Sequence, residues 1–402
     1  MAAGCVRSDG TAESGGALLT HRPRVLVYRD HLLPLSETFV VNQTFGLERF
    51  EAFLLGSKPA HPPRRELPRD RMRLLNVGGP EGLVREILFK FFGRIPRDIL
   101  QWCRSLRPVL VHAHFGPDGT LAMPLAERLG LPLIVSYHGS DATVKDAYAW
   151  GSYIGHRLYR LRRQKLARTA QAFVTPSRFV KKMAVLRQGI PEEKIHVIPH
   201  GVDVQRFYPG PHPEEGRVLF VGRLVELKGL HHLIEAVSQI RASFPRIHLR
   251  VVGDGPERRV FEELARRKLG TACTFVGALP HQGVRDEMQK AFAFCMPSIS
   301  MPNGEAESFG MVFLEAQACG VPVVAYAVGG IPEVVAHGET GFLARENDVE
   351  ALARHLKALL ENVDLRNAMG RAGRARVETH FNRRRQNEAL ENLYQRICRA
   401  GF

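Results

Sequence analysis

Short runs of β-branched and other apolar residues alternate with longer segments of helical periodicity along almost the whole chain. Such alternation is typical of βαβ units, in which parallel strands form a sheet and the connecting helices cover its faces. Strands are predicted at 24–28, 52–55, 109–112, 133–136, 172–174, 196–198, 218–221, 248–252, 273–276, 292–296 and 321–325. Helices are predicted near 37–48, 83–92, 97–104, 121–130, 148–170, 178–188, 230–243, 257–269, 284–290, 309–318, 349–361 and 365–378.

A segment rich in Pro and Gly, residues 207–213, interrupts this alternation near the middle of the chain. The predicted fold class is therefore α/β, with two Rossmann-like, doubly wound parallel-sheet domains facing a cleft. The carboxyl ends of the strands would place a ligand in that cleft. We expect a flexible tail at 1–22, an N-terminal domain at 23–208, a C-terminal domain at 209–380, and a final helix at 381–402 that packs back on the first domain.

The basic residues are concentrated in the first half of the chain. Residues 1–210 hold 31 Lys and Arg against 18 Asp and Glu, a net charge of +13, and the remainder adds +2. This asymmetry suggests that the first half meets a polyanion or an anionic surface. The six cysteines lack metal-ligand spacing, no signal-peptide pattern is present, and no apolar run approaches the ~20 residues of a membrane span. These features predict a cytoplasmic protein.

The strongest chemical signal is a pair of glutamates in the segment Glu307-Ser-Phe-Gly-Met-Val-Phe-Leu-Glu315. Glu307 precedes a predicted helix start, where free N–H groups favour anionic oxygen, and Glu315 lies about two turns further along. One carboxylate could accept sugar hydroxyls while the other accepts ribose hydroxyls. The simpler interpretation is that both are ordinary charges at the start and on the face of a helix.

A second signal is the segment Val221-Gly-Arg-Leu-Val-Glu-Leu-Lys-Gly229, which follows the first predicted strand of the second half. Arg223 and Lys228 put two cations on a loop beside a helix start, an arrangement that suits a pyrophosphate. The alternative is a solvated basic loop. The later segment Gly253-Asp-Gly-Pro256 resembles the start of a dinucleotide fingerprint, but Arg258 replaces its third glycine, so that match is poor.

Taken in order, these motifs resemble the family-4 retaining glycosyltransferases with the GT-B fold, of the exopolysaccharide- and capsule-biosynthesis type. Gly329-Gly-Ile-Pro-Glu333 and the later Gly341-Phe342 complete the set, which is most specific over 196–345. The resemblance implies that Arg223 and Lys228 bind the diphosphate of a nucleotide sugar. The donor is then a substrate, and neither a cofactor nor a metal is expected, because two fixed cations carry the diphosphate charge.

The same resemblance implies that the N-terminal domain is the acceptor side and that the C-terminal domain binds the nucleotide sugar. It also assigns the remaining residues of the donor site. It implies that Glu307 contacts the transferred sugar near the reacting centre and that Glu315 binds the ribose. Backbone amides meet the sugar and the diphosphate, and here they would be those of Phe309, Gly310, Met311 and Val312. The predicted catalytic residues are Glu307, His138, Arg223 and Lys228.

His138 is the clearest candidate in the first half, at the end of a predicted strand in Ser136-Tyr-His-Gly-Ser-Asp141. Family members place such a histidine beside the donor sugar and the acceptor, and a neutral imidazole can donate to a sugar hydroxyl or a leaving oxygen. The alternative is that His138 only fixes its own loop. His112 and His114 share one strand face, but no third ligand accompanies them, so a structural or acceptor-facing role is preferred to a metal site. The Ser36–Phe39 segment stands where the family usually has a glycine-rich loop.

Two basic amphipathic segments remain, at 83–96 and 157–168. The first puts Val84, Ile87, Leu88, Phe91 and Phe92 on one helical side between Arg and Lys residues. Docking on anionic lipid and ordinary core packing with a solvated rim explain this pattern equally well. Nucleic acid is not an expected partner, because aromatic and basic residues are not interleaved as base stacking requires.

The sequence therefore predicts a retaining, metal-independent glycosyltransferase. It would move a hexose-type sugar from a nucleotide diphosphate sugar to a glycan or lipid-linked glycan, in the cytoplasm and peripherally at the inner membrane face. Three alternatives stay open: a nucleotide-sugar epimerase, a glycan phosphorylase, and a non-catalytic sugar-nucleotide-binding or membrane-scaffold protein.

Overall fold

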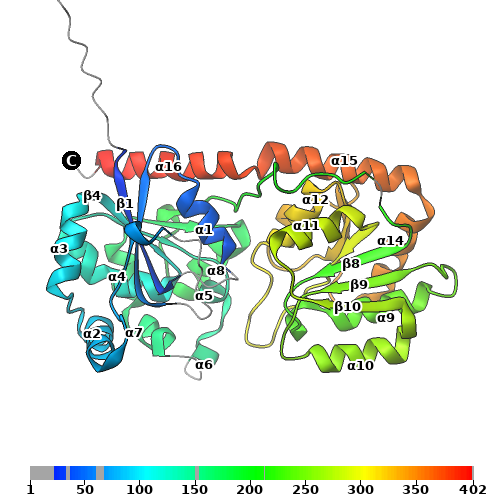
Figure 1. The fold of residues 1–402 in the computed structure, drawn as a ribbon, viewed down its shortest axis with the longest axis horizontal. Helices are drawn as coiled ribbons and strands as arrows, with labels where there is room; N and C mark the ends of the chain where they lie inside the picture. The colour runs from blue at the N-terminus through cyan, green and yellow to red at the C-terminus, as the bar shows by residue number, and fades with distance from the viewer. Residues whose placement is uncertain (1–21, 33–36, 60–67, 150–153, 212, 401–402) are drawn as a thin grey trace, which may run out of the picture.

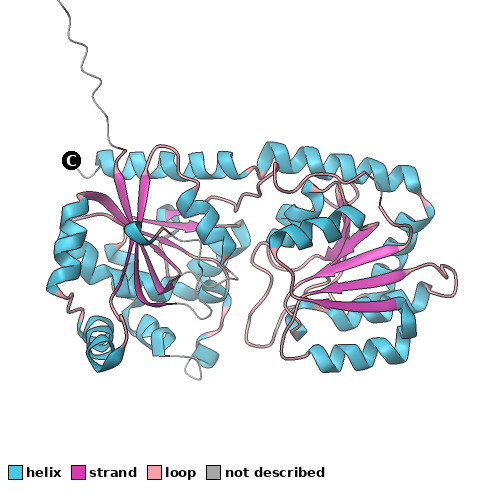
Figure 2. Ribbon diagram, in the orientation of Figure 1, coloured by secondary structure: helices cyan, strands magenta, loops and turns pink. Residues whose placement is uncertain are grey.

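The computed structural model describes residues 22–32, 37–59, 68–149, 154–211 and 213–400. Two α/β domains lie side by side, each built on one parallel sheet with helices on both faces (Figures 1 and 2). The predicted fold class is confirmed. The predicted flexible tail, apart from Arg22, and Ser36 of the first-strand loop lie outside the described residues.

The N-terminal sheet has seven strands in the order β3-β2-β1-β4-β5-β6-β7. These are β1 (Arg24–Leu32), β2 (Glu51–Pro59), β3 (Met72–Leu74), β4 (Pro108–His114), β5 (Leu133–Ser136), β6 (Ala172–Thr175) and β7 (Ile195–Val197). Its helices are α1 (Thr38–Phe45), α2 (Gly79–Phe92), α3 (Arg97–Leu106), α4 (Gly116–Leu129), α5 (Ser140–Thr143), α6 (Asp146–Ala149), α7 (Ile154–Thr169) and α8 (Arg178–Gln188), with the 3₁₀ turns η1 (Arg69–Arg71) and η2 (Glu192–Lys194). The strand order reverses between β1 and β4.

The C-terminal sheet has six strands in the order β10-β9-β8-β11-β12-β13. They are β8 (Arg217–Val221), β9 (His248–Val252), β10 (Cys273–Gly277), β11 (Ala293–Cys295), β12 (Val323–Tyr326) and β13 (Gly341–Ala344). The helices are α9 (Leu230–Ile240), α10 (Arg258–Leu269), α11 (His281–Lys290), α12 (Met311–Ala318), α13 (Ile331–Val334), α14 (Val349–Glu361), α15 (Val363–His380) and α16 (Arg383–Ala400), with η3 (Glu226–Lys228) and η4 (Gly270–Ala272). Here the order reverses between β8 and β11, and such switch points place ligands at the strands' carboxyl ends.

The last helix, α16, returns from the C-terminal domain and packs against the N-terminal one (Figure 1). Tyr394 and Leu390 are buried with residues of β1 and β4 in one apolar cluster. Glu391 accepts hydrogen bonds from the backbone N–H groups of Arg49 and Phe50, at 2.6 and 3.2 Å. The chain therefore crosses between the domains twice, after β7 and again before α16.

Several element boundaries differ from the sequence prediction. The short strands β3 and β13 were not predicted, and α4 begins five residues earlier than expected. The early start of α4 follows from packing, because Gly116 and Gly119 lie too close to Tyr137 and Val135 for a side chain. The predicted helix 148–170 corresponds to α6 and α7, with residues 150–153 between them outside the described part of the chain.

The apolar stripe of helix α2 was a candidate for burial in the core, but the helix buries its other face. Phe89 and Glu86 face inward, and Glu86 pairs with Lys90. The stripe predicted from sequence lies instead at the surface, except for the partly buried Leu88: exposed large apolar residues of α2 are Leu83, Val84, Ile87, Phe91 and Phe92. Ordinary core packing, one of the two explanations of this stripe, is therefore wrong for its four exposed members, Val84, Ile87, Phe91 and Phe92.

Among the described residues, no helix is long and apolar enough to cross a membrane. The five cysteines that the structure describes are free thiols.

Candidate active site

A cavity of about 490 Å³ lies between the two domains, where strands of both sheets reach their carboxyl ends. It is bordered by the segments that follow β8, β9 and β11, and by residues after β5 and β7 of the other domain. All nine site residues predicted from the sequence line it: His138, Arg223, Lys228, Glu307, Phe309, Gly310, Met311, Val312 and Glu315. The fold thus brings together groups that are up to 177 residues apart in the chain.

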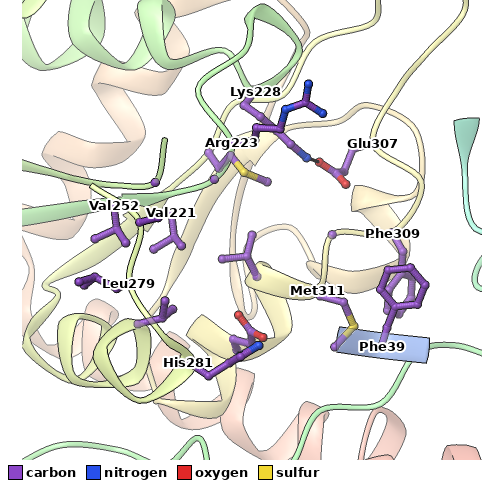
Figure 3. Close-up of a pocket in the computed structure, with 18 of the residues that line it drawn as sticks. Phe39, Val221, Arg223, Lys228, Val252, Leu279, His281, Glu307, Phe309 and Met311 are labelled. Atoms are coloured by element: carbon purple, nitrogen blue, oxygen red, sulfur yellow. Dashed lines mark hydrogen bonds and ion pairs between the residues drawn. The ribbon is translucent and has the colours of Figure 1, made fainter. Parts of the chain in front are cut away.

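Lys228 and Glu307 form an ion pair in this cavity. Lys228 Nζ lies 2.5 Å from Glu307 Oε2, and Ser298 Oγ donates to the same oxygen over 3.3 Å. Glu307 is only 9% exposed, so the two charges interact more strongly than they would on an open surface. Arg223 lies beside the pair on the loop after β8 (Figure 3). A ligand with several negative oxygens would meet two cations here.

The position of Lys228 depends on the glycine that follows it. Gly229 has a φ of 67°, and a Cβ at this residue would collide with the carbonyl oxygen of Pro297. Only glycine accepts both this backbone conformation and this close approach without strain. The turn therefore directs Lys228 into the cavity before α9 begins at Leu230.

The start of α12 forms another wall of the cavity. Its N-cap, Gly310, has a φ of 85° and leads into Met311 and Val312, whose N–H groups have no partner within the helix. Glu315 lies on the next turn of α12, where burial raises the pKa of its carboxyl group to about 8, partly offset by Arg206. Before a ligand binds, Glu315 is therefore largely protonated at neutral pH.

The opposite end of the cavity is apolar. Figure 3 shows Val221, Val252 and Leu279 grouped away from Lys228 and Glu307. The backbone between these groups is unusually tight, because a Cβ at Gly253 (φ 137°) would collide with the carbonyl oxygen of Gly222. The site therefore combines an apolar end with a charged end, within the length of one cavity.

The N-terminal domain contributes three aromatic rings, those of Phe39, His138 and His200. His138 stacks on His200 with ring centroids 5.4 Å apart, and Phe39 lies 4.7 Å from His138. Burial, helped by the neighbouring His200, lowers the pKa of His138 well below its ordinary value. The imidazole is therefore neutral, and its role is hydrogen bonding rather than charge.

One ring nitrogen of His138 has a hydrogen-bond partner, and the other has none among the described residues. Its Nε2 lies 3.0 Å from His114 Nδ1, while no described group hydrogen-bonds to its buried Nδ1. The loop itself is held by Asp141, which accepts from the backbone N–H groups of His138, Gly139 and Gly116. Asp141 therefore fixes the loop through three backbone hydrogen bonds, and the ring of His138 adds its contact with His114.

The His112 and His114 pair has partners of another kind. The two ring nitrogens of His112 lie 2.5 Å from Tyr394 Oη and 2.8 Å from Ser136 Oγ. Among the described residues, no group of three or more His, Cys, Asp or Glu side chains could hold a metal ion. Both histidines therefore belong to hydrogen-bond networks inside the N-terminal domain.

Several lining residues were not predicted as site residues. They include Phe39, His200, Asp254, Leu279, His281 and Ser308. Asp254 and Ser308 lie inside quoted motifs, and a closer examination of those motifs could have found them. Phe39 lies at the start of α1, and His200 and Leu279 follow the ends of β7 and β10, so only the fold shows that the three share a cavity.

Two facing Rossmann-like domains with a cavity at the strands' carboxyl ends define the GT-B architecture, and comparisons with known proteins agree. Residues 37–206 match the family described as Glycosyltransferase Family 4, and residues 203–376 match Glycosyl transferases group 1. The chain belongs to the glycosyltransferases that these two descriptions cover, and the resemblance inferred from its motifs is confirmed.

Individual relatives support the same assignment. One relative is WcaL of Escherichia coli strain K12, a provisionally assigned colanic acid biosynthesis glycosyltransferase. The two sequences are 33% identical over 294 residues, which cover 71% of this chain and 70% of WcaL. This chain is also 32% identical over 349 residues to the D-inositol 3-phosphate glycosyltransferase of Segniliparus rotundus, covering 80% and 75% of the two chains. The structure of this chain resembles that of Anabaena Alr3699/HepE, which was solved with UDP and glucose. The TM-score is 0.71 and the identity 19%, over 93% of this chain and 99% of the other.

Proposed function

We propose that this glycosyltransferase moves a hexose-type sugar from a nucleotide diphosphate sugar to a glycan or lipid-linked glycan, with retention of the anomeric configuration, in surface polysaccharide biosynthesis. The observation that carries the proposal is the Lys228–Glu307 pair beside Arg223, in a cavity that also holds Glu315. The apolar end fits a nucleobase and the charged end fits a diphosphate and sugar. The relative assigned to colanic acid biosynthesis and the neighbour solved with UDP and glucose agree with this choice.

In the proposed mechanism, catalysis is mainly electrostatic and positional. Arg223, Lys228 and the α12 amides stabilise the diphosphate as it leaves, and Glu307 orients the sugar and stabilises the positive charge that develops at its anomeric carbon. The acceptor hydroxyl attacks from the side of the leaving group and loses its proton to the departing phosphate. His138 Nδ1, which has no hydrogen-bond partner among the described residues, would pair with a hydroxyl of the sugar or of the acceptor. No metal is required, because Arg223 and Lys228 supply the positive charge.

A donor screen followed by product analysis tests this function. Thermal unfolding is measured with UDP-, GDP- and ADP-sugars, and at about 100 times its dissociation constant the correct donor stabilises the fold by ~2.7 kcal/mol. Incubation with that donor and a glycan acceptor panel should release the nucleotide diphosphate only when an acceptor is present. NMR of the product should show the anomeric configuration of the donor.

Other outcomes identify the alternatives. An inverted product anomer contradicts the proposed mechanism. Change of the sugar without release of the nucleotide indicates an epimerase, and use of free phosphate indicates a phosphorylase. Binding without turnover over a broad acceptor panel favours the non-catalytic protein.

We also propose that the protein works peripherally at an anionic membrane surface on the cytoplasmic side. The support is the exposed apolar face of α2 (Leu83, Val84, Ile87, Phe91 and Phe92) in the basic half of the chain. Helix α7 packs nearby, because Arg162 donates to the carbonyl oxygens of Lys90 and Phe91. Some of the basic residues of α7 form ion pairs within the N-terminal domain, Arg163 with Asp146 and Lys165 with Glu127. Arg157 and Arg168 of the same helix are exposed.

Replacing Phe92, which is 71% exposed, tests this surface directly. We expect Phe92→Ser to weaken binding to phosphatidylglycerol-containing vesicles about tenfold, the scale of moving a large apolar side chain back into water. The matched control is Val260→Ser, at a 62% exposed residue of α10 in the other domain, which should bind like the wild type. Sedimentation with vesicles is the measurement. Equal binding of both variants, or equal binding to pure phosphatidylcholine vesicles, contradicts the proposal.

A further inference from the structure

The segment Gly329-Gly-Ile-Pro-Glu333 contributes to the family resemblance, yet none of its residues, all of them described, lines the cavity. Its two glycines lie directly against the backbone of the donor-site loop. Gly330 N donates to the carbonyl oxygen of Glu307 over 2.8 Å. A Cβ at Gly329 would collide with that same oxygen, and a Cβ at Gly330 would collide with the carbonyl oxygen of Ser308. The segment is therefore packed directly against the loop that carries Glu307.

Glu333, at the end of this segment, reaches the other domain. Its Oε2 accepts from the backbone N–H of Arg178 over 2.8 Å, and its Oε1 accepts from that of Phe179 over 2.9 Å. These are the first two residues of α8, whose N–H groups have no partner within the helix and whose dipole favours an anion. A carboxylate from the C-terminal domain thus caps a helix of the N-terminal domain.

A third hydrogen bond joins the start of α8 to the loop that carries Glu307. Ser177, the N-cap of α8, donates from Oγ to the carbonyl oxygen of Ser308 over 2.7 Å, while its Oγ accepts from Val180 N. Ser308 also packs closely against the loop that carries His138, because a Cβ at Gly139 would lie 2.9 Å from Ser308 Cβ. Three hydrogen bonds therefore connect the N-terminus of α8 to the segments that carry and support Glu307.

We propose that Glu333 is a positioning residue, which closes the N-terminal domain onto the donor site by capping α8 across the cleft. We call Glu333, Ser177, Ser308 and the backbone of Arg178 and Phe179 the interdomain clasp. Its formation sets His138, which precedes Gly139, opposite the loop of Glu307. The catalytic part of this inference rests on the proposed function, whereas the closure itself does not.

The position of Arg178 allows one N–H group to be removed selectively. Proline is favoured at the first residue of a helix, and Ser177 before it is already extended, with φ −151° and ψ 159°, as a residue before proline requires. Arg178→Pro therefore deletes a donor of the clasp without disturbing the helix start. Arg178→Ala is the matched control, because it removes the same exposed side chain and keeps the N–H.

Closure is measured first on the protein without substrate, by small-angle X-ray scattering. We expect Glu333→Ala and Arg178→Pro to have a larger radius of gyration than the wild type, and Arg178→Ala to match it. Glu333→Gln should lie between, because its amide oxygen can accept only one of the two bonds. Glu263→Ala, at an exposed glutamate of α10, controls for loss of a surface charge.

Turnover provides the second readout, with the donor found in the screen. We expect Glu333→Ala and Arg178→Pro to lower kcat about 10- to 100-fold, the factor for losing hydrogen bonds to a charged group. The Kd of the nucleoside diphosphate that stabilises the wild type (UDP, GDP or ADP) should change less than about twofold, since its proposed ligands lie in the C-terminal domain. The double variant should be no slower than Glu333→Ala, because both changes break one clasp.

The outcomes separate the clasp from the proposed function. If Glu333→Ala scatters and turns over like the wild type, or if the two changes add, the clasp is wrong. A Glu333→Ala protein with a lower melting temperature and equally weakened nucleotide binding shows a merely structural role and also overturns it. If the wild type transfers no sugar, the proposed function fails, and scattering still decides whether the clasp exists. Should Arg178→Pro fail to fold, the Glu333 series carries the same test.

Discussion

Replacing Lys228 by alanine should reduce kcat by a factor of about 10² to 10³, equivalent to ~2.7–4 kcal/mol of lost transition-state stabilisation. Lys228 Nζ is held 2.5 Å from Glu307 Oε2, beside the α12 amides, before any ligand binds. Its charge is thus fixed in advance where the proposed mechanism builds up negative charge on the leaving diphosphate. A side chain that needs no rearrangement at the moment of reaction contributes more than a mobile surface lysine.

Lys268→Ala is the matched control for this variant. Lys268 also forms an ion pair in the C-terminal domain, with Glu235 at 3.0 Å, but both partners are well exposed and outside the cavity. Its loss should leave kcat within about twofold, because exposed ion pairs contribute little. Steady-state kinetics of both variants, with melting temperatures as a check on folding, is the measurement. Near-normal turnover of Lys228→Ala refutes the assignment of this residue.

The sequence predicted the residues of the C-terminal domain that line the cavity because these residues lie close together in the chain. Arg223 and Lys228 follow β8 directly, and Glu307 and Glu315 flank a single helix start, so linear spacing alone places each pair. Parallel strands then bring both pairs to one edge of the sheet. The glycines in these motifs are needed for close backbone approaches such as that of Gly253 to Gly222.

The wall of the cavity that the N-terminal domain forms was harder to predict because its groups meet only through tertiary structure. Phe39 in α1 and His200 after β7 are far apart in sequence and neither was predicted as a site residue, yet both rings contact His138. Similarly, periodicity identified the apolar stripe of α2 but not the direction it faces. That direction follows from buried polar contacts, including those of Glu86 with Asn76 and Lys90, which no hydrophobic pattern reveals.

Short elements escaped prediction for a related reason. The strands β3 and β13 have three and four residues, too few to establish a period of two against the surrounding loops. The first turn of α4, Gly116-Pro117-Asp118-Gly119, has the composition of a loop. It is helical because Pro117 suits a helix start and the two glycines fit between the sheet and α7.

Glu307→Gln should be the most informative change at the reacting end of the site. Glutamine keeps the shape of the side chain and can still accept from Lys228 Nζ and Ser298 Oγ, but it removes the negative charge. If Glu307 stabilises positive charge on the sugar, kcat should fall at least about 100-fold while the affinity for the nucleoside diphosphate changes little. Steady-state kinetics with a nucleotide-binding titration measures both quantities.

Glu305→Gln is the control, because Glu305 lies two residues earlier on the same loop and bonds to Asn303 outside the cavity. It should keep wild-type kcat. Combining Glu307→Gln with Lys228→Ala should cost less than the sum of the two effects, since the side chains contact one another and each single change disturbs the other. A normal kcat in Glu307→Gln, or full additivity, would show that the charge of Glu307 does not act on the transition state, and the sugar would then have to be stabilised by Lys228 and the α12 amides alone.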